Sequence, residues 1–254
     1  MIDRTGTVAA LRAAGVVAAE EEADDLIAAA RSHAALASMV ARRLRGEPTA
    51  WIIGRVDFLG VTIQLDPGVY VPRWKTEALA LHALDHLAPG GTAADLCTGS
   101  GAIGSFLARR RPGARVVGTD VDELAVRCAG RNGIEVFAGD LFDPLPEALR
   151  GTVDVVVSVP PYVPDGMLQF LPPDVTAHEP LRALSGGADG LAVASRIVES
   201  SPGWLRAGGS LVVEVGVDQM GQLKRLFAQH GLRPHAVIED GDGDPAGVCG
   251  STPV

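Results

Sequence analysis

The chain has 254 residues, of which 47% are hydrophobic, so it can bury a sizeable core and is not predominantly disordered. This length exceeds that of one average domain and favours a large α/β unit with a smaller appendage. The 22 basic and 31 acidic side chains give a net charge of −9. That charge argues against broad nucleic-acid binding, because a polyanion is repelled by an acidic surface.

The sequence carries no targeting or metal-binding pattern. Residues 1–4 do not begin a basic segment followed by an apolar run, and acidic residues 20–22 follow early. No stretch approaches the roughly 18 uninterrupted apolar residues that a membrane span needs. The three cysteines (Cys97, Cys128 and Cys249) are widely spaced and the six histidines are scattered. We therefore expect a cytoplasmic protein without membrane association or a bound metal.

Residues 8–44 have helix-favouring composition and apolar side chains at helical spacing, which predicts two or three helices. After a break at Gly46-Glu47-Pro48, residues 51–63 are rich in β-branched and aromatic side chains punctuated by glycine. This pattern predicts a β-hairpin. A connection rich in proline and glycine then leads to a new pattern at about Trp74.

From Thr92 onward, short apolar runs alternate with helical patterns, which predicts βαβ units and a parallel sheet. The expected strands are residues 93–96, 116–118, 134–137, 153–157 and 210–215. The expected helices are residues 76–87, 103–111, 123–132, 191–205 and 219–230. The proline-rich connection 160–187 is long, and structureless loops of more than roughly 12 to 15 residues are usually either functional or disordered. The polar end, residues 250–254, is expected to fray.

A glycine-rich loop lies where the first strand of this sheet passes into its first helix. Gly99, Gly101 and Gly104 satisfy the G-x-G-x-x-G spacing, which lets a ligand approach the backbone and the helix N-terminus. Asp120 ends the second strand, where a carboxylate accepts hydrogen bonds from ribose hydroxyls. Two cofactors fit these features. They are a nicotinamide dinucleotide, with its pyrophosphate at the loop, and S-adenosylmethionine, with its amino-acid end there.

The ends of the next two strands distinguish these cofactors. Asp140 and Leu141 follow the third strand and offer a carboxylate to an adenine amino group and an apolar side chain to its ring. Residues 159–162, Val-Pro-Pro-Tyr, form a rigid loop after the fourth strand, at the sheet edge where ligands bind. Such a loop can hold a flat acceptor nitrogen in line with a methyl–sulfur bond, whereas a dehydrogenase has no evident use for it. Methyl transfer is favoured.

These residues resemble the class I S-adenosylmethionine-dependent methyltransferases, and within them the protein-(glutamine-N5) methyltransferases that modify peptide chain release factors or a ribosomal protein. The resemblance covers nearly the whole chain, including these segments: residues 46–48, 52–54, 66–69, 71–73, 178–180 and 184–191. It implies a Rossmann-like, seven-stranded α/β methyltransferase domain at residues 75–254. Residues 1–74 would form a small helical domain with a hairpin linker that recognises the protein partner, a release factor.

The resemblance also implies roles for individual residues. The cofactor-binding set is Cys97, Thr98, Gly99, Ser100, Gly101, Asp120, Asp140, Leu141 and Val159. The substrate clamp is Val159, Pro160, Pro161 and Tyr162, with Pro160 and Tyr162 as the catalytic pair. Apart from the resemblance, Glu179 lies in a loop that can fold over this clamp. It is a candidate contact to the acceptor, and the alternative is that it caps a helix or anchors the loop.

Two positions depart from the family pattern. Val159 replaces an asparagine whose side chain would hold the glutamine amide, and valine has no donor or acceptor. Losing one such buried hydrogen bond costs about 1–3 kcal/mol, or roughly 5- to 150-fold in rate. The alternatives are therefore a different protein nitrogen or a small molecule as acceptor, or a cofactor-binding homologue without catalysis. Cys97 replaces a glycine, which the loop tolerates if the backbone there keeps a negative φ.

Overall fold

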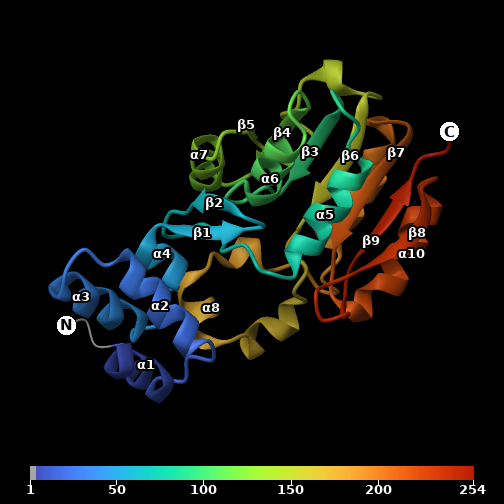
Figure 1. Cartoon of the computed structure of the whole chain (residues 1–254). Coiled ribbons are helices and arrows are strands. Elements are labelled where there is room, and N and C mark those ends of the chain that lie inside the picture. The colour runs from blue at the N-terminus through green and yellow to red at the C-terminus, as the bar shows by residue number, and fades with distance from the viewer. Residues whose placement is uncertain (1–3) are drawn as a thin grey trace.

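The computed structural model describes residues 4–254, apart from the side chains of residues 173 and 174. Residues 1–3 lie outside the described residues, and the expectation that the chain carries no targeting segment rests partly on them. Figure 1 shows the amino-terminal helices at one end of the molecule and a large twisted sheet, flanked by helices, at the other. Within residues 4–254, no helix is both long and apolar enough to cross a bilayer.

The amino-terminal region is helical, as its composition predicts. It contains α1 (Arg4–Ala13), α2 (Ala19–Ala29), α3 (His33–Arg43) and the short α4 (Thr49–Ile53). These helices share a core that includes Leu11, Leu26 and Ile52. The hairpin predicted within residues 51–63 does not include residues 51–53, which belong to α4. Burial of Trp51 and Ile52 against neighbouring segments overrides the β preference of these side chains.

The predicted hairpin is present but shorter, formed by β1 (Arg55–Phe58) and β2 (Val61–Gln64). Leu59 and Gly60 both have positive φ, which suits the tight two-residue turns of hairpins. Phe58 packs edge-on against Phe106 at 6.4 Å between ring centroids. The apolar side chains of the hairpin therefore join the core of the sheet domain, and the boundary after residue 74 stays a prediction.

The sheet has seven strands, as the resemblance predicts. They are β3 (Thr92–Leu96), β4 (Arg115–Asp120), β5 (Glu135–Ala138), β6 (Val153–Ser158), β7 (Leu205–Glu214), β8 (Arg233–Glu239) and β9 (Pro245–Ser251). Their spatial order is β5-β4-β3-β6-β7-β9-β8. The first five are parallel, and β9 runs antiparallel to both of its neighbours. The expected Rossmann-like fold class is confirmed.

Helices cover both faces of this sheet. One face packs against α5 (Thr76–His86), α6 (Ala102–Arg110) and α7 (Glu123–Arg131), and the other against α9 (Ala192–Ser200) and α10 (Met220–Gln229). The helix expected over residues 191–205 ends at Ser200, because Pro202 and Gly203 interrupt it before β7 begins.

The carboxyl terminus is better ordered than its polar sequence suggests. Strand β9 lies between β7 and β8, and Val248 and Cys249 are fully buried. Fraying of residues 250–254 is therefore a wrong expectation for Gly250 and Ser251, which pair with β7 and β8. The long connection after β6 also contains structure: the short helix α8 (Pro173–His178) and two 3-10 turns, Asp165–Phe170 and Leu181–Ala183.

Candidate active site

A cavity of about 440 Å³ opens at the carboxyl end of β3. Strand β3 is the topological switch point, because β4 lies on one side of it and β6 on the other. Open α/β sheets bind ligands at this position. Eleven of the residues predicted for the site line this cavity: Cys97, Thr98, Gly99, Ser100, Asp120, Asp140, Leu141, Val159, Pro160, Pro161 and Tyr162.

The glycine loop has the conformation that its sequence requires. Gly99 and Gly101 have φ of +55° and +79°. A Cβ added at Gly99 would meet no atom of the described chain within 4 Å, so this backbone borders open space. At Gly104 a Cβ would lie 2.9 Å from a methyl carbon of Ile134. The loop thus combines close approach by a ligand with tight packing of α6 beneath it.

Asp120 braces this loop from the end of β4. One carboxylate oxygen accepts a hydrogen bond from the Gly99 N–H and the other from the Asp122 N–H, each at 2.9 Å. Burial raises the pKa of Asp120 above its usual range. Next to it, the buried Thr119 Oγ1 lines the same cavity and has no hydrogen-bond partner among the described residues. A ligand with polar groups would satisfy it.

Cys97 lies in this cavity and has a φ of +55°. The loop was expected to tolerate a cysteine here only with a negative φ, and that condition is not met. A left-handed conformation costs a residue other than glycine about 1–2 kcal/mol. Burial also raises the pKa of its thiol to about 12. A thiol that stays protonated is a poor nucleophile, which agrees with a packing role and not a catalytic one.

The third strand contributes Asp140 and Leu141 on the opposite wall of the cavity. Asp140 forms an ion pair with Arg196 of α9 at 2.6 Å. Leu141 is almost fully buried and has a φ of +49°. Both residues line the cavity, as does Arg196.

The Pro-Pro-Tyr segment is held by the glycine-rich run at residues 184–190. Backbone hydrogen bonds of 2.9 Å join Val163 to Leu184 and to Gly186. A Cβ at Gly190 would lie 2.2 Å from the Tyr162 carbonyl oxygen. That oxygen instead accepts a hydrogen bond from Gln219 Nε2 at 2.8 Å. The glycines of this run therefore permit a second chain segment to lie directly against the clamp.

A buried carboxylate fixes the Tyr162 side chain. The Tyr162 hydroxyl and Glu214 are hydrogen-bonded, and Glu214 also accepts from Thr76 Oγ1 at 2.8 Å. Burial, followed by the Glu214 charge, raises the Tyr162 pKa, so the phenol stays protonated. Glu214 and Gln219 were not predicted from the sequence. For Glu214, the sequence offered one signal, an acidic residue near the end of the apolar strand expected at 210–215. For Gln219, it offered no such signal.

The structure does not bring Gly101 and Glu179 to the lining of this cavity. Gly101 caps the start of α6, between the lining residues Ser100 and Ala102. Glu179 is buried and forms an ion pair with Arg73, beside a second cavity bordered by the amino-terminal helices and the hairpin. Arg73 also lies over the Tyr70 ring, 5.1 Å from its centroid. Glu179 is thus linked through Arg73 to Tyr70, which lines the first cavity.

Known proteins resemble this chain over most of its length. Residues 61–170 match the family model described as the Methyltransferase small domain. A release factor glutamine methyltransferase of Geobacter sulfurreducens is 36% identical, with 83% of this chain and 75% of the relative aligned. The chain belongs to the release factor glutamine methyltransferase family. It is an S-adenosylmethionine-dependent methyltransferase, which confirms the predicted cofactor and enzyme class.

Another protein similar to this chain is named for a different acceptor. A 4-amino-L-phenylalanine/4-methylamino-L-phenylalanine methyltransferase of Streptomyces pristinaespiralis is 39% identical, with 78% of this chain and 70% of the relative aligned. Among solved structures, a methyltransferase from Pyrococcus furiosus superposes with a TM-score of 0.59 at 20% identity, covering 86% of this chain and all of that one. That likeness agrees with the fold.

Proposed function

We propose that the chain methylates a glutamine side-chain amide in a peptide chain release factor. The observation that carries the proposal is the rigid Pro-Pro-Tyr segment at the mouth of the cofactor cavity, in a chain whose relatives include release factor glutamine methyltransferases. The amino-terminal helices and the hairpin would bind the protein substrate. They border a second cavity whose charged walls include Glu22, Arg43, Arg55 and Glu179.

The residues of the first cavity suit S-adenosylmethionine. Asp120 would accept from the ribose hydroxyls, Asp140 and Leu141 would contact the adenine, and the glycine loop would receive the amino-acid end. When bound, this cofactor supplies a methyl group activated on a sulfonium. The chain contributes mainly orientation, because the Pro160 carbonyl and the hydrogen-bonded Tyr162 ring fix the place of the acceptor nitrogen.

A second candidate function follows from Val159. This side chain lines the cavity where the family pattern has an asparagine, so it cannot hydrogen-bond a primary amide. An apolar wall suits an aromatic amine, and one relative is named as a methyltransferase of 4-amino-L-phenylalanine. We propose a small aromatic amine as the alternative acceptor.

Methyl transfer to defined acceptors separates these proposals. The full chain is incubated with labelled S-adenosylmethionine and either a purified peptide chain release factor or 4-amino-L-phenylalanine, and the labelled atom is mapped by mass spectrometry. Label on a glutamine amide is expected for the first proposal and on the aryl nitrogen for the second. If the cofactor binds in calorimetry but neither acceptor nor a cell extract is labelled, the chain is a binding protein without catalysis, and both proposals fail.

A further inference from the structure

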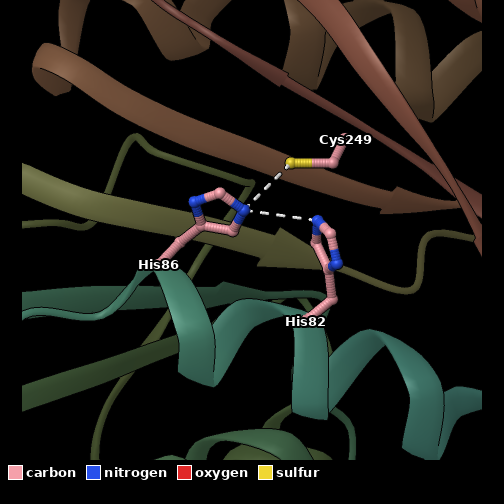
Figure 2. Close-up of side chains that lie close together, drawn as sticks. All are labelled: His82, His86 and Cys249. Carbon is pink, nitrogen blue, oxygen red and sulfur yellow. Dashed lines mark hydrogen bonds between the residues drawn. The ribbon is translucent and has the colours of Figure 1, made fainter.

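Two histidines and a cysteine converge at a place that methyl transfer does not use. His82 and His86 are one helical turn apart on α5, and Cys249 lies on β9, far away in the sequence. Figure 2 shows the three side chains pointing toward one another. The sequence predicted no metal site because this cysteine is 163 residues from His86. The helical spacing of the two histidines was the only local signal.

The distances between the potential ligand atoms are close to those in a tetrahedral metal site. The Nε2 atoms of His82 and His86 are 3.3 Å apart, and Cys249 Sγ lies 3.8 Å from His86 Nε2. Zinc bonds of about 2.0–2.1 Å to nitrogen and 2.3 Å to sulfur place tetrahedral ligands roughly 3.3 and 3.6 Å apart. All three atoms lie within 4.8 Å of one another, and His82 is only half-buried.

The surroundings prepare these groups for a cation. The buried Ser210 Oγ lies 3.1 Å from His86 Nδ1. When Nδ1 donates to it, the lone pair of Nε2 faces His82 and the sulfur, the arrangement that orients metal-binding histidines. Burial, together with the charge of neighbouring histidines, lowers the pKa values of His82 and His86. Both rings are therefore neutral at physiological pH, the form that binds metal.

A third imidazole lies beside the sulfur. His235 Nε2, on the exposed edge strand β8, is 3.7 Å from Cys249 Sγ, and its ring centroid is 5.7 Å from that of His86. His235 Nε2 also lies 2.8 Å from Ser251 Oγ, and a metal bond from this atom would replace that hydrogen bond. Imidazole and thiolate together favour zinc over the hard cations magnesium and calcium, which prefer oxygen ligands.

We propose that His82, His86 and Cys249 bind one Zn²⁺ ion, with His235 completing the site. The ion would join α5 to β9, one of the strands formed by the carboxyl-terminal part of the chain. The site is separate from the methyl-transfer cavity, which α5 meets at Thr76. His82 and His86 are six and ten residues farther along the helix, or about 9 and 15 Å at the usual helical rise.

Cobalt is the direct probe, because a cobalt–thiolate bond gives an intense near-ultraviolet charge-transfer band. The untagged full chain, reduced and stripped of metal by a chelator, is titrated with Co²⁺ and then with Zn²⁺. We expect one equivalent of Co²⁺ to produce the band and one of Zn²⁺ to abolish it. At Zn²⁺ a hundredfold above its Kd, the melting temperature should rise by about 5–10 °C.

Variants assign the ligands. Cys249→Ser should lose the charge-transfer band, and His82→Ala should weaken Co²⁺ binding at least tenfold. His82 is half-buried on a helix, so its alanine variant is expected to fold, which circular dichroism without metal verifies. Cys128→Ser and His33→Ala are the matched controls and should keep both the band and the thermal shift. The proposal is overturned if the wild-type chain shows no one-to-one binding, or if His82→Ala binds Co²⁺ as tightly as wild type.

Discussion

The Gln219 side chain holds the backbone of Tyr162. Its Nε2 donates to the Tyr162 carbonyl oxygen at 2.8 Å and to the Asp189 carbonyl oxygen at 2.9 Å, while its Oε1 accepts from the Gly216 N–H. One side chain thus joins the Pro-Pro-Tyr segment, the glycine-rich run and the turn that precedes α10.

Gln219→Ala should therefore slow methyl transfer without weakening the binding of S-adenosylmethionine. Loss of these hydrogen bonds lets the clamp move, and a displacement of about 1 Å lowers the rate roughly 100-fold. Steady-state kinetics should show a lower kcat with little change in the Kd for S-adenosylmethionine. Gln222→Ala, which removes an exposed contact to the Asp189 side chain, is the control. Equal effects of the two variants would contradict a positioning role for Gln219.

Asp120→Ala should weaken S-adenosylmethionine binding. The carboxylate that would receive the ribose hydroxyls is lost, and the Gly99 N–H loses its acceptor. Hydrogen bonds to a charged group contribute about 1.5–3 kcal/mol, so the Kd should rise roughly 10- to 150-fold. Isothermal titration calorimetry measures it, with the exposed Asp143→Ala as control. An unchanged Kd would remove Asp120 from the cofactor site.

Val159→Asn tests the acceptor. If the natural substrate is a glutamine amide, the added side chain should raise kcat/KM for a release factor roughly 5- to 150-fold by supplying the missing hydrogen bond. The exposed Val121→Asn changes the same residue type at another position on the cavity wall and should have little effect. A fall in activity toward an aromatic amine, with no gain on the release factor, would favour the small-molecule acceptor.

Cys97→Gly should leave the loop intact and stabilise the fold by up to about 1 kcal/mol. Glycine removes the energetic cost of a positive φ at this position. This gain is partly offset because glycine has more conformational freedom than cysteine in the unfolded chain. Urea unfolding measures the free energy of unfolding. Cys128→Gly makes the same change inside helix α7 and should destabilise the chain by about 1 kcal/mol or more. Similar losses in both variants would show that the strain at residue 97 is negligible.

The buried Asp95 should make stability depend on pH. Its Oδ2 accepts from Thr98 Oγ1 at 2.6 Å and from the Gly104 N–H at 3.0 Å, but burial raises its pKa to about 7. The folded state thus keeps the proton longer than the unfolded state. The contribution to stability is complete below the ordinary carboxyl pKa of about 4 and is lost as pH rises through about 7.

Asp95→Asn removes this titration while retaining an oxygen acceptor. Relative to wild type, the variant should gain on the order of 1–4 kcal/mol in the free energy of unfolding between pH 4.5 and pH 8. Urea unfolding at both pH values measures the difference, with Asp143→Asn as the matched exposed control. A difference that is the same at both pH values would show that Asp95 is ionised throughout.

The sequence alone determined the architecture and the cofactor. Alternating strand and helix patterns indicated the parallel sheet, and local motifs at the ends of four strands placed Gly99, Asp120, Asp140 and Pro160 at one edge. This succeeds because parallel strands bring their carboxyl ends together, so spacing along the chain translates into proximity. The resemblance then supplied the family, which the known relatives confirm.

The tertiary structure decided what depends on contacts between distant segments. Packing turned residues 49–53 into a helix and residues 245–251 into a buried strand. It placed Glu179 against Arg73 and brought Gln219 to the clamp. It also gathered His82, His86 and Cys249. Such contacts depend on how the helices dock on the sheet. The hydrophobic effect that drives this docking is non-directional, so the sequence near each residue does not show which distant residue it will meet.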